Sequence, residues 1–365
     1  MRNWLFTILM ALVSVFTLSS QELEWSVDMN AVFKNTEVEN SVTPGQTNIF
    51  TRITPQIGVS MDSTRHRIMG GVTWYQPMND HLHGYKVLPA LYYQYKNLKK
   101  GLEFKFGVVP NELKALCPTY LRSDSINIVQ PNVKGAVFTV NKPHFFIYSW
   151  LDWRQIQTQN KREAFDVTGQ FGWQTHKGDN LFTASAVLRY NHLSVSKQHF
   201  EGEGVVDNFI FSPQLSYMHW WSDINISLLA GILMSCDRDR VADKKWNTPV
   251  GFIATAKANW KWLTLTENFY AGDRQMPFYE KYGSLVYQGD PFYHNKIYSR
   301  TDLVATIFQR DFVNLEARLT FHASEDKKTA FSQQLAVRFF IDNHIWKNHK
   351  NKPKGVYINS LPAQF

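Results

Sequence analysis

Apolar and polar residues alternate along most of the chain after residue 20. In the first such stretch the apolar positions are Trp25, Val27, Met29, Ala31 and Phe33, and the residues between them are mostly polar. The same period of two recurs in residues 49–61, 102–108, 182–191, 224–235, 252–259, 314–321 and 334–341. Because successive side chains of a strand point to opposite faces, this period predicts strands with one apolar and one polar face.

The predicted strands have the length and order of a membrane-spanning barrel. With weaker neighbours they number about sixteen, each roughly ten residues long, which suits a tilted transmembrane strand. Short connections are expected at residues 62–65, 97–100, 141–144, 176–180, 219–223, 259–261 and 309–311. Longer ones are expected at 35–46, 76–86, 109–134, 155–162, 194–206, 236–247, 272–295 and 322–328. This alternation predicts an all-β fold, a transmembrane antiparallel up-and-down β-barrel with short periplasmic turns and long extracellular loops.

Aromatic residues near the short turns support a membrane interface at that end. Such residues form girdles where a barrel meets the lipid headgroups. The set consists of Trp25, Tyr95, Trp173, Tyr217, Trp220, Trp221, Trp260 and Trp262. Three prolines inside predicted strands, Pro55, Pro89 and Pro213, remove ladder hydrogen bonds, so we expect those strands to be shortened, bulged or shifted in register.

The polar face of the predicted strands indicates a wet interior. A sheet can cross hydrocarbon only if it closes, and a barrel of this size is too wide for its own side chains to fill. Charged residues on the inward face would be costly in a packed core but are tolerated beside water. The predicted pore-lining residues are Arg52, Lys105, Arg154, Arg189, Arg300, Arg318, Arg338, Asp28, Glu103, Asp302 and Glu316, and Asp152 is assigned to the same inward face.

The two ends of the chain differ from the strand region. Arg2, the apolar run 4–18 and the small residues Ser19 and Ser20 predict a signal peptide over residues 1–20. Removing it leaves a formal charge of +7, because Arg2 is its only charged residue. The barrel is then expected over residues 21–341, and the basic tail 342–365 in the periplasm.

Composition excludes several other classes of protein. The chain has 365 residues, of which 44% are hydrophobic and 15% aromatic, too much apolar surface for a disordered protein. The two cysteines, Cys117 and Cys236, have no metal-binding spacing and could form at most one bridge. Basic residues are spread along the chain, so no nucleic-acid partner is expected. No cofactor or metal is expected either.

On strand number, signal peptide and loop alternation, the chain resembles Gram-negative outer-membrane porins. The segment 104–110, a strand ending in Gly-x-x-Pro before a long loop, is similar to the start of the third loop in phosphate-selective and related porins. In such porins this loop folds into the channel and sets its width, although the Pro-Glu-Phe-Gly-Gly tip of general porins is absent here. The resemblance implies an eyelet formed by loop 109–134, with Glu112, Lys114, Arg122 and Asp124 at its edge.

The resemblance also implies a function. The expected protein is a porin in the outer membrane of a Gram-negative bacterium, without enzymatic activity, that lets small hydrophilic solutes diffuse with a weak preference for anions. Its expected partners are outer-membrane lipid, lipopolysaccharide and the solutes, and a homotrimer is possible. The preference follows from the excess of inward Arg and Lys over Asp and Glu.

Three other interpretations stay open on the sequence. The barrel could serve as a surface adhesin or assembly partner through its long loops or its tail, or the chain could be a secreted all-β sugar-binding protein. The segment 191–194, Asn-His-Leu-Ser, is similar to the Asn-His-x-Ser of outer-membrane phospholipase, with His192 as base and Ser194 as nucleophile, but the rest of that pattern is missing. His81 and His83 could ligate a metal, although loop histidines are more often simply polar.

Overall fold

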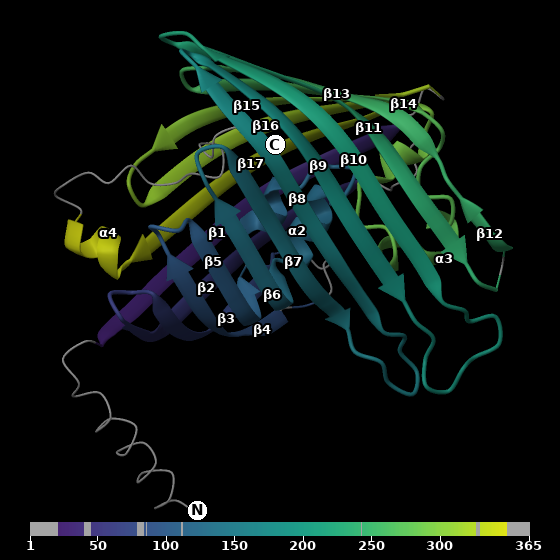
Figure 1. Cartoon of the computed structure of the whole chain (residues 1–365), viewed down its shortest axis with the longest axis horizontal. Coiled ribbons are helices and arrows are strands. Elements are labelled where there is room, and N and C mark those ends of the chain that lie inside the picture. Colours follow the sequence, from purple (N-terminus) through teal and green to yellow (C-terminus); the bar gives the residue numbers. More distant parts are fainter. Residues whose placement is uncertain are drawn as a thin grey trace, which may run out of the picture.

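The protein is a closed antiparallel β-barrel. A computed structural model describes residues 21–39, 45–78, 84, 86–110, 112–241, 243–325 and 329–348. Figure 1 shows long tilted strands wrapped into one cylinder, with short helices inside the wall and one, α4 (Asn343–Asn348), beyond the end of the last strand. The predicted signal peptide, most of the predicted tail and the His81 and His83 pair lie outside the described residues.

The wall consists of sixteen strands among the described residues, and β12 is a short addition to them. The strands are β1 (Glu22–Glu39), β2 (Gln46–Met61), β3 (His66–Pro77), β4 (Lys86–Asn97), β5 (Leu102–Pro110), β6 (Asn132–Asn141), β7 (Phe145–Gln155), β8 (Ala164–Lys177), β9 (Asn180–Leu193), β10 (Val206–Trp220), β11 (Ile224–Asp239), β12 (Asp243–Asn247), β13 (Val250–Trp260), β14 (Leu263–Gly272), β15 (Ile297–Gln309), β16 (Val313–Ser324) and β17 (Thr329–Asp342). The helices are η2 (Glu112–Leu116), α2 (Asp124–Val129), α3 (Tyr279–Tyr282), η3 (Gly283–Leu285), η4 (Pro291–His294) and α4 (Asn343–Asn348).

The first and last strands close the barrel. β1 pairs with β2 on one side and with β17 on the other, where Met29 lies opposite Phe339. Every other neighbouring pair in the wall is also antiparallel, and β12 extends the outer end of β11 beyond its pairing with β13. The predicted all-β class, antiparallel barrel and number of strands are therefore confirmed.

The two faces of the wall follow the alternation in the sequence. Large apolar side chains such as Ile57, Phe106 and Leu215 are exposed on the outside, as lipid contact requires. The three strand prolines leave β2, β4 and β10 continuous and in register, with Pro55 opposite Val27 and Pro213 opposite Ala186. The described strands are therefore neither bulged nor shifted in register at the prolines. Pairing is nevertheless lost on one side of each proline, since β2–β3 skips Pro55, β10–β11 skips Pro213, and β4–β5 stops at Leu91 before it reaches Pro89.

The short turns lie at one end of the barrel, together with both ends of the described wall. At the turn between β4 and β5, Gly101 has a φ of +57°, and a Cβ there would lie 1.9 Å from the carbonyl oxygen of Asn141. At the turn between β8 and β9, Gly178 has a φ of +58° and open space around it. Gly101 is therefore required both by its left-handed backbone and by the lack of space for a side chain. Gly178 is required by its left-handed backbone alone.

Replacing these glycines by alanine should separate the two costs. Gly178→Ala is expected to lower the free energy of unfolding by about 1–2 kcal/mol, the cost of a left-handed conformation. Gly101→Ala should lose about 1–3 kcal/mol more, because the new methyl group overpacks against the neighbouring turn. Urea-dependent unfolding of the refolded barrel measures both changes. Equal losses in the two variants would contradict the predicted clash at Gly101.

The lumen at the long-loop end is filled by two connections rather than by water alone. Residues 112–131 and 273–296 fold inward, and their buried aromatic and aliphatic side chains pack against the inner wall. The largest cluster includes Tyr120, Tyr287, Tyr293 and Tyr298. The sequence predicted an inward loop only for the first connection. Among the described residues, no helix is long and apolar enough to cross a membrane.

Candidate functional sites in the lumen and on the outer wall

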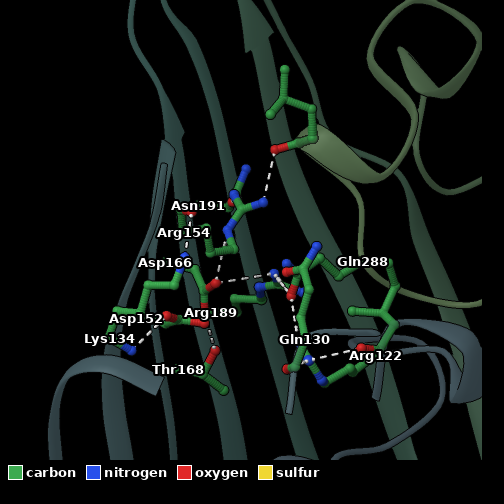
Figure 2. A network of polar contacts seen from close by, with 12 residues as sticks. Arg122, Gln130, Lys134, Asp152, Arg154, Asp166, Thr168, Arg189, Asn191 and Gln288 are labelled. Carbon is green, nitrogen blue, oxygen red and sulfur yellow. Dashed lines mark hydrogen bonds and ion pairs between the residues drawn. The ribbon is translucent and has the colours of Figure 1, made fainter. Parts of the chain in front are cut away.

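A buried network of charged and polar groups ties both inward connections to the wall (Figure 2). Asp166 on β8 lies at its centre, with its Oδ1 atom 3.1 Å from Nε of Arg154 and 3.6 Å from Nη2 of Arg189. Arg189 also donates hydrogen bonds to the carbonyl of Leu121 and, at 2.9 Å, to Oε1 of Gln288. The two arginines thus link the wall to both connections at once.

Arg122 completes this network from the first inward connection. Its Nη1 atom donates to Oε1 of Gln288 at 2.8 Å, and its Nη2 atom donates to the carbonyls of Ile126 and Gln130. The side chain is almost fully buried. Arg122 therefore joins the two connections to each other, which the sequence did not indicate.

Two other residues of the predicted eyelet are held by ion pairs. Lys114 donates to Asp152 on β7 and, at 2.7 Å, to the carbonyl of Asn132. Burial lowers the pKa of the Lys114 ammonium group to about 8, and the charge of Asp152 opposes that shift. Asp124 accepts from Arg300 at 2.9 Å. Partial burial favours a higher pKa for the Asp124 carboxyl, but Arg300 and Lys34 outweigh it and hold that pKa well below its usual range.

The predicted pore-lining residues fall into two groups in space. Asp28, Arg52, Glu103, Lys105 and Arg338 line a vestibule of about 800 Å³ at the short-turn end. The remaining predicted residues do not line this vestibule but interact with groups on the wall or on the inward connections, and they are Arg154, Arg189, Arg300, Asp302, Arg318 and Glu316. The side chain of Glu112 lies outside the described residues. A pore-lining or eyelet role for these residues stays a prediction.

A second polar site lies on the outside of the wall at the long-loop end. The strand register aligns Phe165 of β8, His192 of β9, Asp207 of β10 and Arg238 of β11 in one row across the wall. Trp153 of β7 extends the row beyond Phe165. Polar groups here occupy the outward face, where apolar residues are the rule in a membrane barrel. We call these five residues, with Tyr190 and Arg240, the outer-wall site.

His192 and Asp207 are the centre of the outer-wall site. Nδ1 of His192 lies 3.0 Å from Oδ1 of Asp207, and the Tyr190 hydroxyl donates to the same oxygen at 2.9 Å. Nη2 of Arg240 donates to the other carboxylate oxygen at 2.8 Å. The His192 ring packs against Phe165, with ring centroids 5.1 Å apart. These contacts fix the imidazole in one orientation, as a general base requires.

Ser194 does not join His192 in this site. Its Oγ atom accepts from the backbone nitrogen of Glu163 at 3.1 Å and donates to the carbonyl of Val195 at 3.0 Å. The Asn-His-x-Ser dyad of the sequence is therefore not assembled. The sequence missed Asp207 because it lies fifteen residues beyond His192, across a long loop. The alternation does place both residues on the outward face, but only the register brings them together.

Arg238 occupies the end of the row nearest β12. Its guanidinium carbon lies 5.6 Å from the centre of the Trp246 ring, a cation–π distance. Its Nε atom is buried and has no hydrogen-bond partner among the described residues. A buried guanidinium nitrogen without an acceptor is costly. Arg238 as a whole is only partly buried on the outward face, so the rest of its guanidinium group places a positive charge at the surface of the outer-wall site.

Other candidate groups do not come together. The cysteines are free within the described structure, since Cys117 packs beside the lumen clusters whereas Cys236 pairs with the lipid-exposed Phe209 on the outward face. The open possibility of a bridge is thereby removed. Within the described ranges, no group of three or more His, Cys, Asp or Glu side chains could hold a metal ion.

Fold and sites together define an outer-membrane type β-barrel with a porin-like fold, two inward connections in its lumen and a cluster of polar residues on its outward face. Residues 15–348 match the family described as lipid A 3'-O-deacylase-type, and the chain belongs to that family. The expectation of a protein without enzymatic activity is therefore wrong, because this family is named for an enzyme. Strand periodicity could not reveal this, since porins and barrel enzymes share it. A search for similar curated proteins found no match.

Solved structures with the same fold are porins and related outer-membrane proteins. OccK8 (OprE) of Pseudomonas aeruginosa has a TM-score of 0.51 at 10% sequence identity, covering 88% of this chain and 98% of that one. OccK9 (OpdG) of the same organism has a TM-score of 0.53 at 8% identity, with the same coverages. OmpT of Vibrio cholerae has a TM-score of 0.53 at 9% identity, covering 89% and 99%. At these identities the likeness concerns the fold.

Proposed function

We propose that this protein hydrolyses an acyl ester of an outer-leaflet lipid in the outer membrane of a Gram-negative bacterium. The observation that carries the proposal is the hydrogen-bonded His192–Asp207 pair on the outward face of the wall, at the long-loop end. An imidazole oriented by a carboxylate is the usual general base for ester hydrolysis. The family name supports the 3'-linked acyl chain of lipid A as the substrate.

The proposed ester hydrolysis uses one water molecule as nucleophile and the His192 side chain as general base. With the Nδ1 proton directed to Asp207, Nε2 is the nitrogen that accepts a proton from water as its oxygen attacks the ester carbonyl carbon. The tetrahedral intermediate then expels the sugar alkoxide, which takes the proton back from His192. The products are a free fatty acid and a lipid with one new hydroxyl group, so atoms and charges balance.

The arginines of the outer-wall site favour a lipid substrate with an anionic headgroup. Arg238 is partly buried beside Trp246 and Arg240 is half exposed while it holds Asp207, so both place positive charge on the outward face. Phosphate groups at the membrane surface are natural partners for guanidinium ions. Trp153 and Trp246 flank the site with rings suited to the headgroup region.

The direct test uses the full chain refolded in detergent with purified lipid A. Mass spectrometry should show loss of one acyl chain from the lipid, together with release of the matching fatty acid. A heat-unfolded sample is the control. If the folded barrel leaves the lipid intact under all conditions tried, including added divalent cations, the proposal is overturned.

The vestibule favours a second function, passive diffusion of small hydrophilic solutes with a weak anion preference. Its volume is about 800 Å³, and its mixed lining includes the charged side chains of Arg52, Lys105 and Arg338. Diffusion through the lumen and hydrolysis on the outer wall do not exclude each other, because they use opposite faces of the strands.

Planar-bilayer recordings under a potassium chloride gradient test this second function. We expect measurable conductance with a reversal potential that indicates chloride permeation at least as easy as potassium permeation. A strongly cation-selective channel would refute the anion preference. Absence of conductance would refute diffusion through this conformation of the inward connections.

A further inference from the structure

A groove runs along the lipid-facing side of the same strands that carry the outer-wall site. It encloses about 830 Å³ and is almost entirely apolar. Small residues form its floor, above all Ala184 and Ala186 of β9, and bulkier ones such as Phe171, Leu215 and Phe252 rise beside them. Ala186 is only 7% exposed although it lies on the outward face, because its neighbours on adjacent strands are larger.

The strand register connects this groove to His192. Ala186 aligns with Phe171 on β8 and with Pro213 on β10, in a row parallel to that of His192. The two rows are six positions apart on β9, which corresponds to roughly 20 Å along the strand. The outward residues between them are Leu188 and Tyr190. A ligand lying along β9 thus meets a continuous wall surface from the outer-wall site to the groove.

The separation of the two sites matches the depth of one lipid leaflet. A strand tilted by about 40° descends roughly 15 Å over this distance. Half of the hydrocarbon core of a bilayer is also about 15 Å thick. An acyl chain whose ester lies at His192 therefore ends at the level of Ala186.

We propose that the groove holds the far end of the acyl chain that is cleaved at His192, and so selects long chains. This inference rests on the proposed function. Inside a membrane an acyl chain gains no hydrophobic free energy from leaving other lipid, so its preference for a protein surface comes from close packing. Alanine rows flanked by Phe171 and Phe252 provide a depression of the width such packing needs. A short chain ends before the depression and gains nothing from it.

The test fills the groove and compares two chain lengths. Ala186→Phe should slow hydrolysis of a tetradecanoyl-bearing lipid on the order of tenfold relative to the wild type, a typical effect of pocket shape. Hydrolysis of the octanoyl analogue should change by less than about twofold, within the usual range of a neutral surface change. Ala184→Leu, which is milder because this residue is exposed, should give a smaller effect of the same kind. Ala305→Phe, at an outward position on β15, is the matched control and should change neither rate.

A binding measurement separates this inference from the proposed function. Native mass spectrometry of His192→Ala protein should show stronger retention of the tetradecanoyl lipid than of the octanoyl lipid, and Ala186→Phe should abolish that difference. If the rate of hydrolysis does not depend on chain length in any variant, the proposed role of the groove is wrong and the proposed enzymatic function stands. If lipid retention depends on chain length but the wild type does not hydrolyse the lipid, the proposed enzymatic function is wrong and acyl-chain binding in the groove stands. Equal retention of both lipids by His192→Ala protein would also overturn the groove.

Discussion

Replacing His192 with alanine is expected to slow acyl-ester hydrolysis by about 10²- to 10⁴-fold, the usual contribution of a general base. The loss follows from removal of the nitrogen that accepts the proton of the attacking water. Binding of the lipid should persist, because the groove and the arginines remain. The measurement is the initial rate of fatty-acid release by protein whose folding is verified by heat-modifiable migration on gels.

Ser194→Ala is the matched control for this prediction. Ser194 lies two residues from His192, yet its hydroxyl is engaged by the backbone of Glu163 and Val195. We expect its removal to leave the rate within a factor of two or so, since surface substitutions away from a site have small effects. If Ser194→Ala removes activity as completely as His192→Ala, the water mechanism is wrong and the phospholipase-like dyad is right.

Replacing Asp166 with asparagine is expected to loosen both inward connections. Asp166 is the shared carboxylate of Arg154 and Arg189, and its side chain is buried. Removing one member of a buried ion pair costs about 3–5 kcal/mol, because the remaining charges lose their counterion. The wall should survive, because strand pairing closes it independently of the connections. Single-channel conductance should therefore rise several-fold, and proteases should cut within residues 112–131 or 273–296.

Asp223→Asn controls for loss of one negative charge. Asp223 lies in a short turn, where its 4.0 Å contact with Lys261 is exposed and worth little. We expect the conductance and protease resistance of the Asp223→Asn variant to equal those of the wild type. Unchanged conductance and protease resistance in Asp166→Asn would show that the network does not hold the connections in place.

Much of the architecture follows from local pattern. Alternation around positions such as Phe33, Ile57 and Leu215 assigns one face to lipid, because each strand residue can point only outward or inward. The short turns also follow locally, since Gly101 and Gly178 supply the left-handed conformation that two of them require. Closure then follows from the need to pair every backbone group in hydrocarbon.

The candidate sites were predictable only in part. Alternation places His192 on the lipid side and Arg154, Arg189 and Arg300 on the inner side, and the start of the first inward connection resembles a channel loop. The partner of His192 depends on the register of β9 with β10, which is set by the whole length of both strands. Membership of the deacylase-type family, which is what indicates an enzyme, rests on sequence similarity along the chain. The alternation of apolar and polar residues carries no such information.

The sequence alone therefore determines the strands, their order and the face on which each side chain lies, because these depend on neighbours one or two residues away. Only the tertiary structure decided that residues 273–296 enter the lumen, that Asp166 anchors both connections and that Cys117 and Cys236 are on opposite sides of the wall. It also decided that Asp207 meets His192. These contacts join residues far apart along the chain. They stabilise the protein only once the strands and connections that carry them have packed together.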